Sequence, residues 1–208
     1  MADLAALTAA IEAGDRTRAT ALTQAAIDEG IAPDVVLAAM TSAMDEIGRR
    51  FQANEIYVPE MLISARAMKE SVKLLEPLLV EAGIRPEFTA VIGTVKGDLH
   101  DIGKNLVAMM WKGANIEVID LGANVSPEQF VAAAREHGAQ LVGLSALLTT
   151  TMVGMKDVVV ALRAAGIPAR VIVGGAPLTQ AFADQIGAHG YAPDAASAVE
   201  VALKLAKG

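Results

Sequence analysis

The sequence predicts an α/β protein in which a four-helix bundle precedes a five-stranded, doubly wound parallel sheet. Apolar residues recur at helical spacing from residue 4 to residue 81. From about residue 88, short β-branched runs alternate with helical segments, the pattern of a parallel sheet. Between them lies the breaker-rich stretch EAGIRPEF, residues 81–88. We therefore expect two domains, over residues 1–84 and 85–208.

The first domain contains about four helices. Their apolar stripes are Val36, Met40, Ala43, Ile47 and Phe51, and then Met61, Ala65, Met68, Val72, Leu75 and Leu79. The expected helix boundaries agree with these stripes, because Gly14 and Gly30 suit helix ends and Pro59 suits a first helical turn. Short connections favour antiparallel neighbours, so a small bundle is the expected packing.

The second domain alternates strands and helices. We expect strands at 89–95, 116–121, 140–145 and 169–174 and a short one around 190–191, with helices at 103–113, 127–137, 152–165, 178–186 and 194–206. Ser126 is placed to cap a helix that has Pro127 in its first turn and Gln129 for a capping box. The apolar runs LVGLSAL and RVIVGG fit strands buried on both faces.

Composition narrows the class of function. The chain has no cysteine, which excludes disulfides, thiolate metal sites and thiol nucleophiles. Its net charge of −7 disfavours binding to a nucleic-acid backbone. No apolar run approaches the roughly 18 residues of a membrane helix, and the N-terminus lacks the pattern of an export signal. We expect a cytoplasmic protein that binds neither nucleic acid nor membrane.

The expected ligand site lies at the carboxyl ends of the strands. In a flavodoxin-like sheet with strand order 2-1-3-4-5, ligands bind where neighbouring connections leave on opposite faces, between the first and third strands. The polar loop 96–103 follows the first strand, and Ser145 ends the third. Gly174 and Gly175 follow the fourth strand and let a bulky group approach the backbone.

Three alternatives compete for the loop GDLHDIGK. A phosphate loop has four residues between its glycine and its Gly-Lys pair, whereas five separate Gly97 from Gly103 here, and Asn105 replaces the Ser or Thr that binds magnesium. A hydrolytic metal site built on Asp98, His100 and Asp101 needs further ligands, yet the other histidines, His137 and His189, lie far along the chain. In the third alternative, His100 is simply hydrogen-bonded within its loop.

Three motifs in order favour a different interpretation. They are Asp98-x-His100-x-x-Gly103, Ser145-x-Leu147 and Gly174-Gly175. Together they resemble the cobalamin-binding signature of methionine synthase, the B12-dependent mutases and the corrinoid proteins of methyl-transfer systems. Residues 51–62 resemble the join between the third and fourth helices of the bundle in those corrinoid proteins. The resemblance covers nearly the whole chain, and it implies a Rossmann-like B12-binding domain preceded by a four-helix bundle cap.

The resemblance implies a role for each motif. His100 is the lower axial ligand of cobalt, Asp98 accepts a hydrogen bond from the other imidazole nitrogen, and Ser145 hydrogen-bonds Asp98. This trio sets the protonation state of the ligand during the reaction. Gly103, Gly174 and Gly175 give room to the corrin and its nucleotide tail. The further cofactor contacts are Leu99, Asp101, Ile102, Leu147, Thr149, Tyr191, Ala192 and Asp194, with Met61 and Leu62 of the bundle above the corrin.

The implied function is that of a methyl carrier. A substrate-specific methyltransferase loads the methyl group onto cobalt, and a second methyltransferase moves it to a pterin or thiol. A reductive activator of the corrinoid is a third partner, and a hinge near residues 82–88 lets the bundle move aside. The alternatives are a B12-dependent sensor or regulator and the small subunit of an adenosylcobalamin mutase.

Overall fold

The structure, a computed structural model, describes residues 3–208 in two compact units. The first contains the residues up to Pro86 together with Lys112–Asn115, and the second contains Glu87–Trp111 and Ile116–Gly208. The break after Pro86 lies within the breaker-rich stretch. None of the helices in the described part of the chain is long and apolar enough to cross a membrane.

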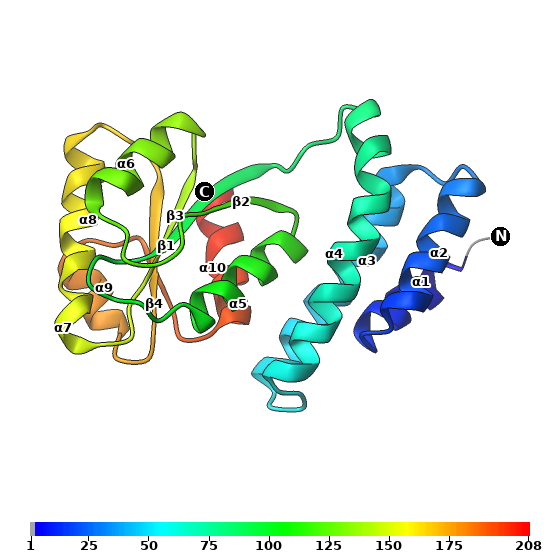
Figure 1. Ribbon diagram of the computed structural model, residues 1–208, viewed down its shortest axis with the longest axis horizontal. Coiled ribbons are helices and arrows are strands. Elements are labelled where there is room, and N and C mark those ends of the chain that lie inside the picture. The colour runs from blue at the N-terminus through cyan, green and yellow to red at the C-terminus, as the bar shows by residue number, and fades with distance from the viewer. Residues whose placement is uncertain (1–2) are drawn as a thin grey trace. The chain divides into compact units, whose positions relative to one another are not determined.

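The first unit is a bundle of α1 (Leu4–Glu12), α2 (Arg16–Asp28), α3 (Pro33–Gln52) and α4 (Val58–Glu81) (Figure 1). The side chains of Asp3 and Asp15 cap α1 and α2 by accepting backbone N–H groups, and α3 and α4 each carry a proline in the first turn. The helices pack as pairs, chiefly α2 with α4 and α1 with α3. Most residues of the predicted stripes are buried, among them Val36, Met40, Ile47, Met68 and Leu75, whereas Phe51 and Val72 are partly exposed.

The second unit is built on five parallel strands. They are β1 (Phe88–Thr94), β2 (Ile116–Asp120), β3 (Leu141–Ser145), β4 (Arg170–Gly174) and β5 (Gly190–Ala192). Their order is β2-β1-β3-β4-β5, which confirms the predicted doubly wound topology. The central strands β1 and β3 are buried along most of their length, as the continuous apolar runs indicate.

Helices cover both faces of this sheet (Figure 1). One face carries α6 (Pro127–Glu136), α7 (Thr149–Met152), α8 (Gly154–Ala164) and α9 (Gln180–Ile186) over a continuous apolar core. On the other face lie α5 (Ile102–Gly113) and α10 (Ala195–Lys207), where the indole N–H of Trp111 donates to the carbonyl of Ala198 at 2.9 Å. The helix predicted over 152–165 is α8, and the separate short helix α7, which was not predicted, is followed by one residue, Val153, before α8 begins.

The register of the sheet brings the three motifs to one level. Thr94 pairs with Ser145, Ser145 pairs with Gly174, and Gly174 pairs with Ala192. The loops that leave β1, β3 and β4 therefore begin side by side at the carboxyl edge. This is the place at which the topology predicts a ligand.

Candidate functional site

The loop after β1 places a buried carboxylate beside an exposed imidazole. The side chain of Asp98 has no exposed surface, whereas 52% of the His100 side chain is exposed. Nδ1 of His100 lies 2.7 Å from Oδ1 of Asp98, and the backbone N–H of His100 donates to the same oxygen at 3.0 Å. Oδ2 accepts the backbone N–H of Leu147 at 2.8 Å and the hydroxyl of Thr151 at 2.6 Å. Two loops thus converge on one carboxylate.

These donors keep Asp98 ionised and thereby fix the tautomer of His100. Burial alone raises the pKa of Asp98, but the hydrogen bonds from Thr151, His100 and Leu147 outweigh burial and hold that pKa well below its usual range. An ionised carboxylate only accepts hydrogen bonds, so Nδ1 of His100 carries the shared proton. In the neutral ring, the lone pair is then on Nε2, and the His100 side chain is half exposed. This is the arrangement of a metal-binding histidine whose second nitrogen is held by a carboxylate.

The expected hydrogen bond from Ser145 to Asp98 is corrected by the structure. Among the described residues, the hydroxyl that donates to Asp98 belongs to Thr151 of α7. Ser145 ends β3 beside Thr94, and its place in the site stays a prediction. Thr149, the threonine chosen from the sequence, is exposed in the first turn of α7. The short helix presents the third threonine of the run, and linear spacing does not reveal which one.

Further hydrogen bonds hold the loop to the strand before it and to the loop after β2. The hydroxyl of Thr94 donates to the carbonyl of His100 at 3.0 Å. Oδ1 of Asn124 accepts the backbone N–H of Gly97 at 2.8 Å, and the backbone N–H of Asn124 donates to the carbonyl of Asp98 at 3.0 Å. Asn124 has a left-handed φ of 59°, which asparagine adopts more readily than most residues. Asn124 was absent from the sequence prediction, and its only signal was its place in the loop between β2 and α6.

The first turn of α5 contains a buried lysine that sequence reasoning also missed. The side chain of Lys104 is 1% exposed, and its Nζ lies 2.6 Å from both carboxylate oxygens of Asp120 at the end of β2. Nζ also donates to Oδ1 of Asn105, whose amide nitrogen donates to Oδ2 of Asp101 at 3.0 Å. This network connects β2 to the residue that follows His100. It therefore holds the far end of the loop.

Large apolar side chains lie exposed at the same edge of the sheet. Leu99 is 76% exposed and Ile102 is 81% exposed, both beside His100 in the chain. The segment after β3 adds Leu147, Leu148 and Val153. Exposed large apolar residues gathered in this way are typical of a binding surface. A hollow of about 210 Å³, lined in part by Thr151 and Val153, adjoins them.

The surroundings of the three motif glycines differ in whether they leave room for a side chain. Gly175 has a φ of 138°, and a Cβ there would lie 1.9 Å from the carbonyl oxygen of Ala146, so the protein's own backbone requires this glycine. At Gly174 a Cβ would lie 3.2 Å from the carbonyl oxygen of Ala192. Gly103, in the first turn of α5, has no atom within 4 Å of a built Cβ. Protein packing therefore does not explain Gly103.

The remaining predicted contacts have structural roles of their own. Tyr191 packs against the core and Ala192 is buried. The carboxylate of Asp194 caps α10, accepting an N–H group at 2.8 Å and a hydroxyl at 2.9 Å from that helix. In the bundle, Met61 is fully buried and Leu62 is 37% exposed. The contacts of these five residues with a cofactor stay predictions.

The hydrolytic alternative required three protein ligands around one metal. The described residues contain no group of three or more His, Cys, Asp or Glu side chains placed to hold an ion. His137 ends α6, and the ring of His189 accepts the N–H of Val171 at the opposite edge of the sheet. Among the described histidines, His100 is the one at the carboxyl edge.

Known proteins match the chain over nearly its whole length. Two family models, each described as a B12 binding domain, match residues 4–76 and 88–200. A corrinoid protein of Desulfitobacterium hafniense is 40% identical over 202 residues, which cover 94% of each chain. Dimethylamine corrinoid protein 3 of Methanosarcina acetivorans is 39% identical, covering 94% of this chain and 88% of that protein. A chain in the methanol:cobalamin methyltransferase complex of Methanosarcina barkeri is 30% identical with a TM-score of 0.88, covering 99% of this chain and 80% of that one.

The chain therefore belongs to the B12-binding proteins. Its site fits such a cofactor, because the His100 side chain is half exposed, a Cβ at Gly103 would meet no atom within 4 Å, and the exposed side chains of Leu99 and Ile102 lie next to these residues in the chain. Within that class it is a methyl-carrying corrinoid protein of the methyl-transfer systems, and its cofactor is cobalamin or a related corrinoid. The predicted fold, a helical bundle before a B12-binding α/β domain, is confirmed.

Proposed function

We propose that the chain carries a methyl group from a substrate-specific methyltransferase to a second methyltransferase, whose acceptor is a pterin or a thiol. The observation that supports this most directly is the half-exposed imidazole of His100, whose Nδ1 is held by the buried carboxylate of Asp98 so that Nε2 is the nitrogen left for a metal. A methyl carrier needs a metal ligand, and it needs that ligand on a surface that other proteins reach. The carboxyl edge of the sheet offers a ligand, His100, on an exposed surface.

His100 would hold cobalt through Nε2, while the bound corrinoid supplies a metal centre that accepts and releases a methyl group. Asp98 keeps Nδ1 protonated and sets the direction of the ring, since its two oxygens are fixed by donors from Leu147 and Thr151. Its negative charge raises the electron-donating strength of the imidazole. The ring can thereby serve as a ligand that is held firmly in one orientation.

The surrounding residues would seat the macrocycle. Leu99, Ile102 and Leu147 present apolar surface that loses contact with water when a flat apolar group covers it. Gly103 leaves backbone space beside His100. Because these residues flank the ligand on two loops, the corrinoid would lie across the carboxyl edge.

The partners are proposed from the relatives. The Methanosarcina barkeri structure is a methanol:cobalamin methyltransferase complex, and several similar proteins are named dimethylamine corrinoid proteins. We therefore propose a small methylated amine or alcohol as the methyl donor and a dedicated methyltransferase as the loading partner. A reductive activator of the corrinoid completes the proposed set of partners.

The test follows a labelled methyl group. The chain is reconstituted with cobalamin, reduced, and incubated with a candidate methyltransferase and its ¹⁴C-methyl substrate in the dark. The label is expected to co-elute with the chain in gel filtration and to leave it when a second methyltransferase and its acceptor are added. A variant with His100→Ala is the matched control, and it should retain less label.

Two results would contradict the proposal. One is label that never co-elutes with the corrinoid-loaded chain, whichever methylated amine or alcohol and partner are supplied. The other is label that stays on the chain after every pterin and thiol acceptor has been offered with its methyltransferase.

A further inference from the structure

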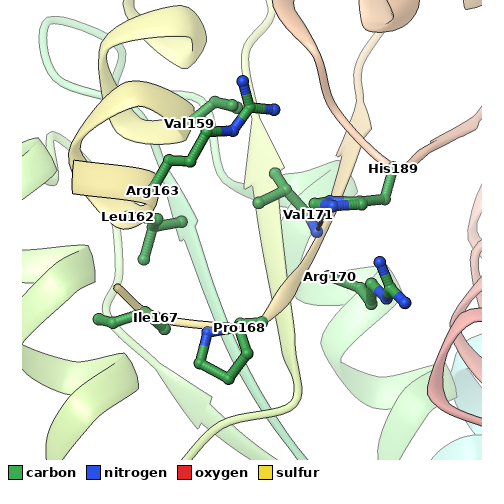
Figure 2. A pocket seen from close by; sticks show the side chains of 9 residues that line it. Val159, Leu162, Arg163, Ile167, Pro168, Arg170, Val171 and His189 are labelled. Atoms are coloured by element: carbon green, nitrogen blue, oxygen red, sulfur yellow. Dashed lines mark hydrogen bonds between the residues drawn. The ribbon is translucent and has the colours of Figure 1, made fainter. Parts of the chain in front are cut away.

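A second hollow lies at the amino-terminal edge of the sheet, opposite the His100 loop. It measures about 330 Å³ and is formed by the end of α8, the connection to β4 and the residue before β5 (Figure 2). Apolar side chains of α8 and β4 form its floor, including Leu162 and Val171. Three basic residues complete its lining, namely Arg163, Arg170 and His189, and we call it the basic hollow.

Hydrogen bonds hold two of the three basic side chains of the basic hollow, those of His189 and Arg163. Nδ1 of His189 accepts the backbone N–H of Val171 at 2.9 Å, so in the neutral ring the proton is on Nε2. One Nη atom of Arg163 donates to the carbonyl of Gly187 at 3.1 Å, which holds this guanidinium in place. A guanidinium has no acceptor. Arg163, Arg170 and neutral His189 therefore offer N–H groups, and the described side chains that line the hollow contribute no oxygen to accept them.

The charge in the basic hollow is uncompensated by its lining. The pKa of His189 is lowered, first by burial and then by the positive charges of Arg170 and Arg163. Among the described residues that line the hollow, none is Asp or Glu. A bound anion would relieve the mutual repulsion of these positive groups.

We propose that the basic hollow binds an oxyanion, a phosphate or carboxylate group, carried on an apolar body. The oxyanion would accept hydrogen bonds from Arg163, Arg170 and Nε2 of His189, and the apolar body would rest on the floor at Leu162 and Val171. Arginine is suited to this task because its planar fork binds two oxygens at once. This site is separate from the carboxyl edge, so it does not depend on the methyl-carrier role.

A hydrogen bond from an arginine to a backbone carbonyl, such as the bond of Arg163, does not require a place in the basic hollow. Arg135 at the end of α6 makes the same kind of bond as Arg163, since its guanidinium donates to the carbonyl of Ala165 at 3.2 Å. Arg135 does so outside the basic hollow. It therefore provides a matched control, because Arg135→Gln removes an equivalent bond without touching the proposed site.

The test is an NMR titration of the full-length chain, with inorganic phosphate, phenyl phosphate, benzoate and phenol as probes at constant ionic strength. We expect saturable shifts at the amides of Val171 and His189 with phenyl phosphate, weaker binding of inorganic phosphate, and no binding of phenol. Arg163→Gln and Arg170→Gln should each weaken phenyl phosphate about tenfold, the factor typical of one lost charge-assisted hydrogen bond. Arg135→Gln should leave the affinity unchanged.

The outcomes separate the possibilities. A preference for phenyl phosphate over benzoate identifies phosphate as the group that is bound, and the reverse identifies carboxylate. The proposal is overturned if neither anion gives saturable shifts, if phenol binds as well as phenyl phosphate, or if folded Arg170→Gln protein binds phenyl phosphate as tightly as the parent. A thermal melt of each variant shows that it is folded, and Arg170→Gln keeps the test valid if Arg163→Gln fails to fold.

Discussion

Replacing Thr151 with valine removes one hydrogen bond to Asp98 and keeps the branched shape of the side chain. The hydroxyl has a single proton and two acceptors within reach, the carboxylate of Asp98 at 2.6 Å and the carbonyl of Leu148 at 3.0 Å. The shorter bond to the charged group is the stronger one. A hydrogen bond to a charged group contributes about 1.5–3 kcal/mol. Because Asp98 keeps its other donors, we expect the free energy of unfolding to fall by about 1.5–2 kcal/mol at pH 7.

The loss should depend on pH in a defined direction. The folded pKa of Asp98 lies below the unfolded value of about 3.9, so its carboxylate stabilises the fold above that value and stops doing so as pH falls through the folded pKa. Removing the Thr151 donor moves the folded pKa upward. The unfolded pKa is common to both proteins, so the difference between the parent and Thr151→Val should be the same at pH 7 and pH 5 and shrink only as pH falls through the folded pKa of the variant, which lies above that of the parent.

Urea unfolding followed by tryptophan fluorescence measures this difference. The chain has one tryptophan, Trp111, which is fully buried in the second unit and reports on its unfolding. Thr149→Val is the control, because Thr149 is exposed in the same short helix. The reasoning is refuted if Thr149→Val destabilises the unit as much as Thr151→Val, or if Thr151→Val changes the free energy of unfolding by less than about 0.5 kcal/mol.

Three further substitutions test the site. Gly103→Ala should leave the free energy of unfolding unchanged or raise it by up to about 1 kcal/mol, because alanine favours a helix more than glycine does. The same substitution should weaken cobalamin binding measured by equilibrium dialysis, and normal binding would mean that the cofactor does not use the space beside His100. Gly175→Ala should destabilise the second unit by about 3 kcal/mol or more in urea unfolding, because the alanine Cβ would meet the carbonyl oxygen of Ala146. A cost below about 1 kcal/mol would show that the loop after β4 shifts freely. Lys104→Met should cost about 2–3 kcal/mol in the same assay, less than a fully buried pair because a third of Asp120 is exposed. Adding Asp120→Asn should restore part of that loss, and a double variant no more stable than the single one would contradict this pairing.

The fold was predictable because its signals are local and agree with one another. The change from helical spacing to alternating strands and helices marks the two units, and the strand positions follow from β-branched runs such as VIV in β4. The strand order followed from the topology rules for alternating strands and helices. The short helix α7 escaped prediction because its four residues are too few to show a helical apolar period.

Part of the site was predictable for a different reason. Asp98 and His100 are two residues apart, so a single loop sets their contact. A short sequence motif is therefore enough to predict it. The partners of Asp98 come from the segment around Leu147 and Thr151, about fifty residues further along the chain, and depend on how the loop after β3 turns. Lys104 is a similar case, since only the packing of α5 against β2 buries it.

The proposed bond between Nε2 of His100 and cobalt is tested most directly by electron paramagnetic resonance of the Co(II) state. The chain is produced with ¹⁴N-histidine and with ¹⁵N-histidine, and both samples are loaded with unlabelled cobalamin. If His100 is the axial ligand, the nitrogen splitting changes from a triplet to a doublet on labelling, and it disappears in His100→Ala protein that retains its corrinoid. A triplet that persists in the ¹⁵N-labelled protein would show that the cofactor's own base, and not His100, holds the metal.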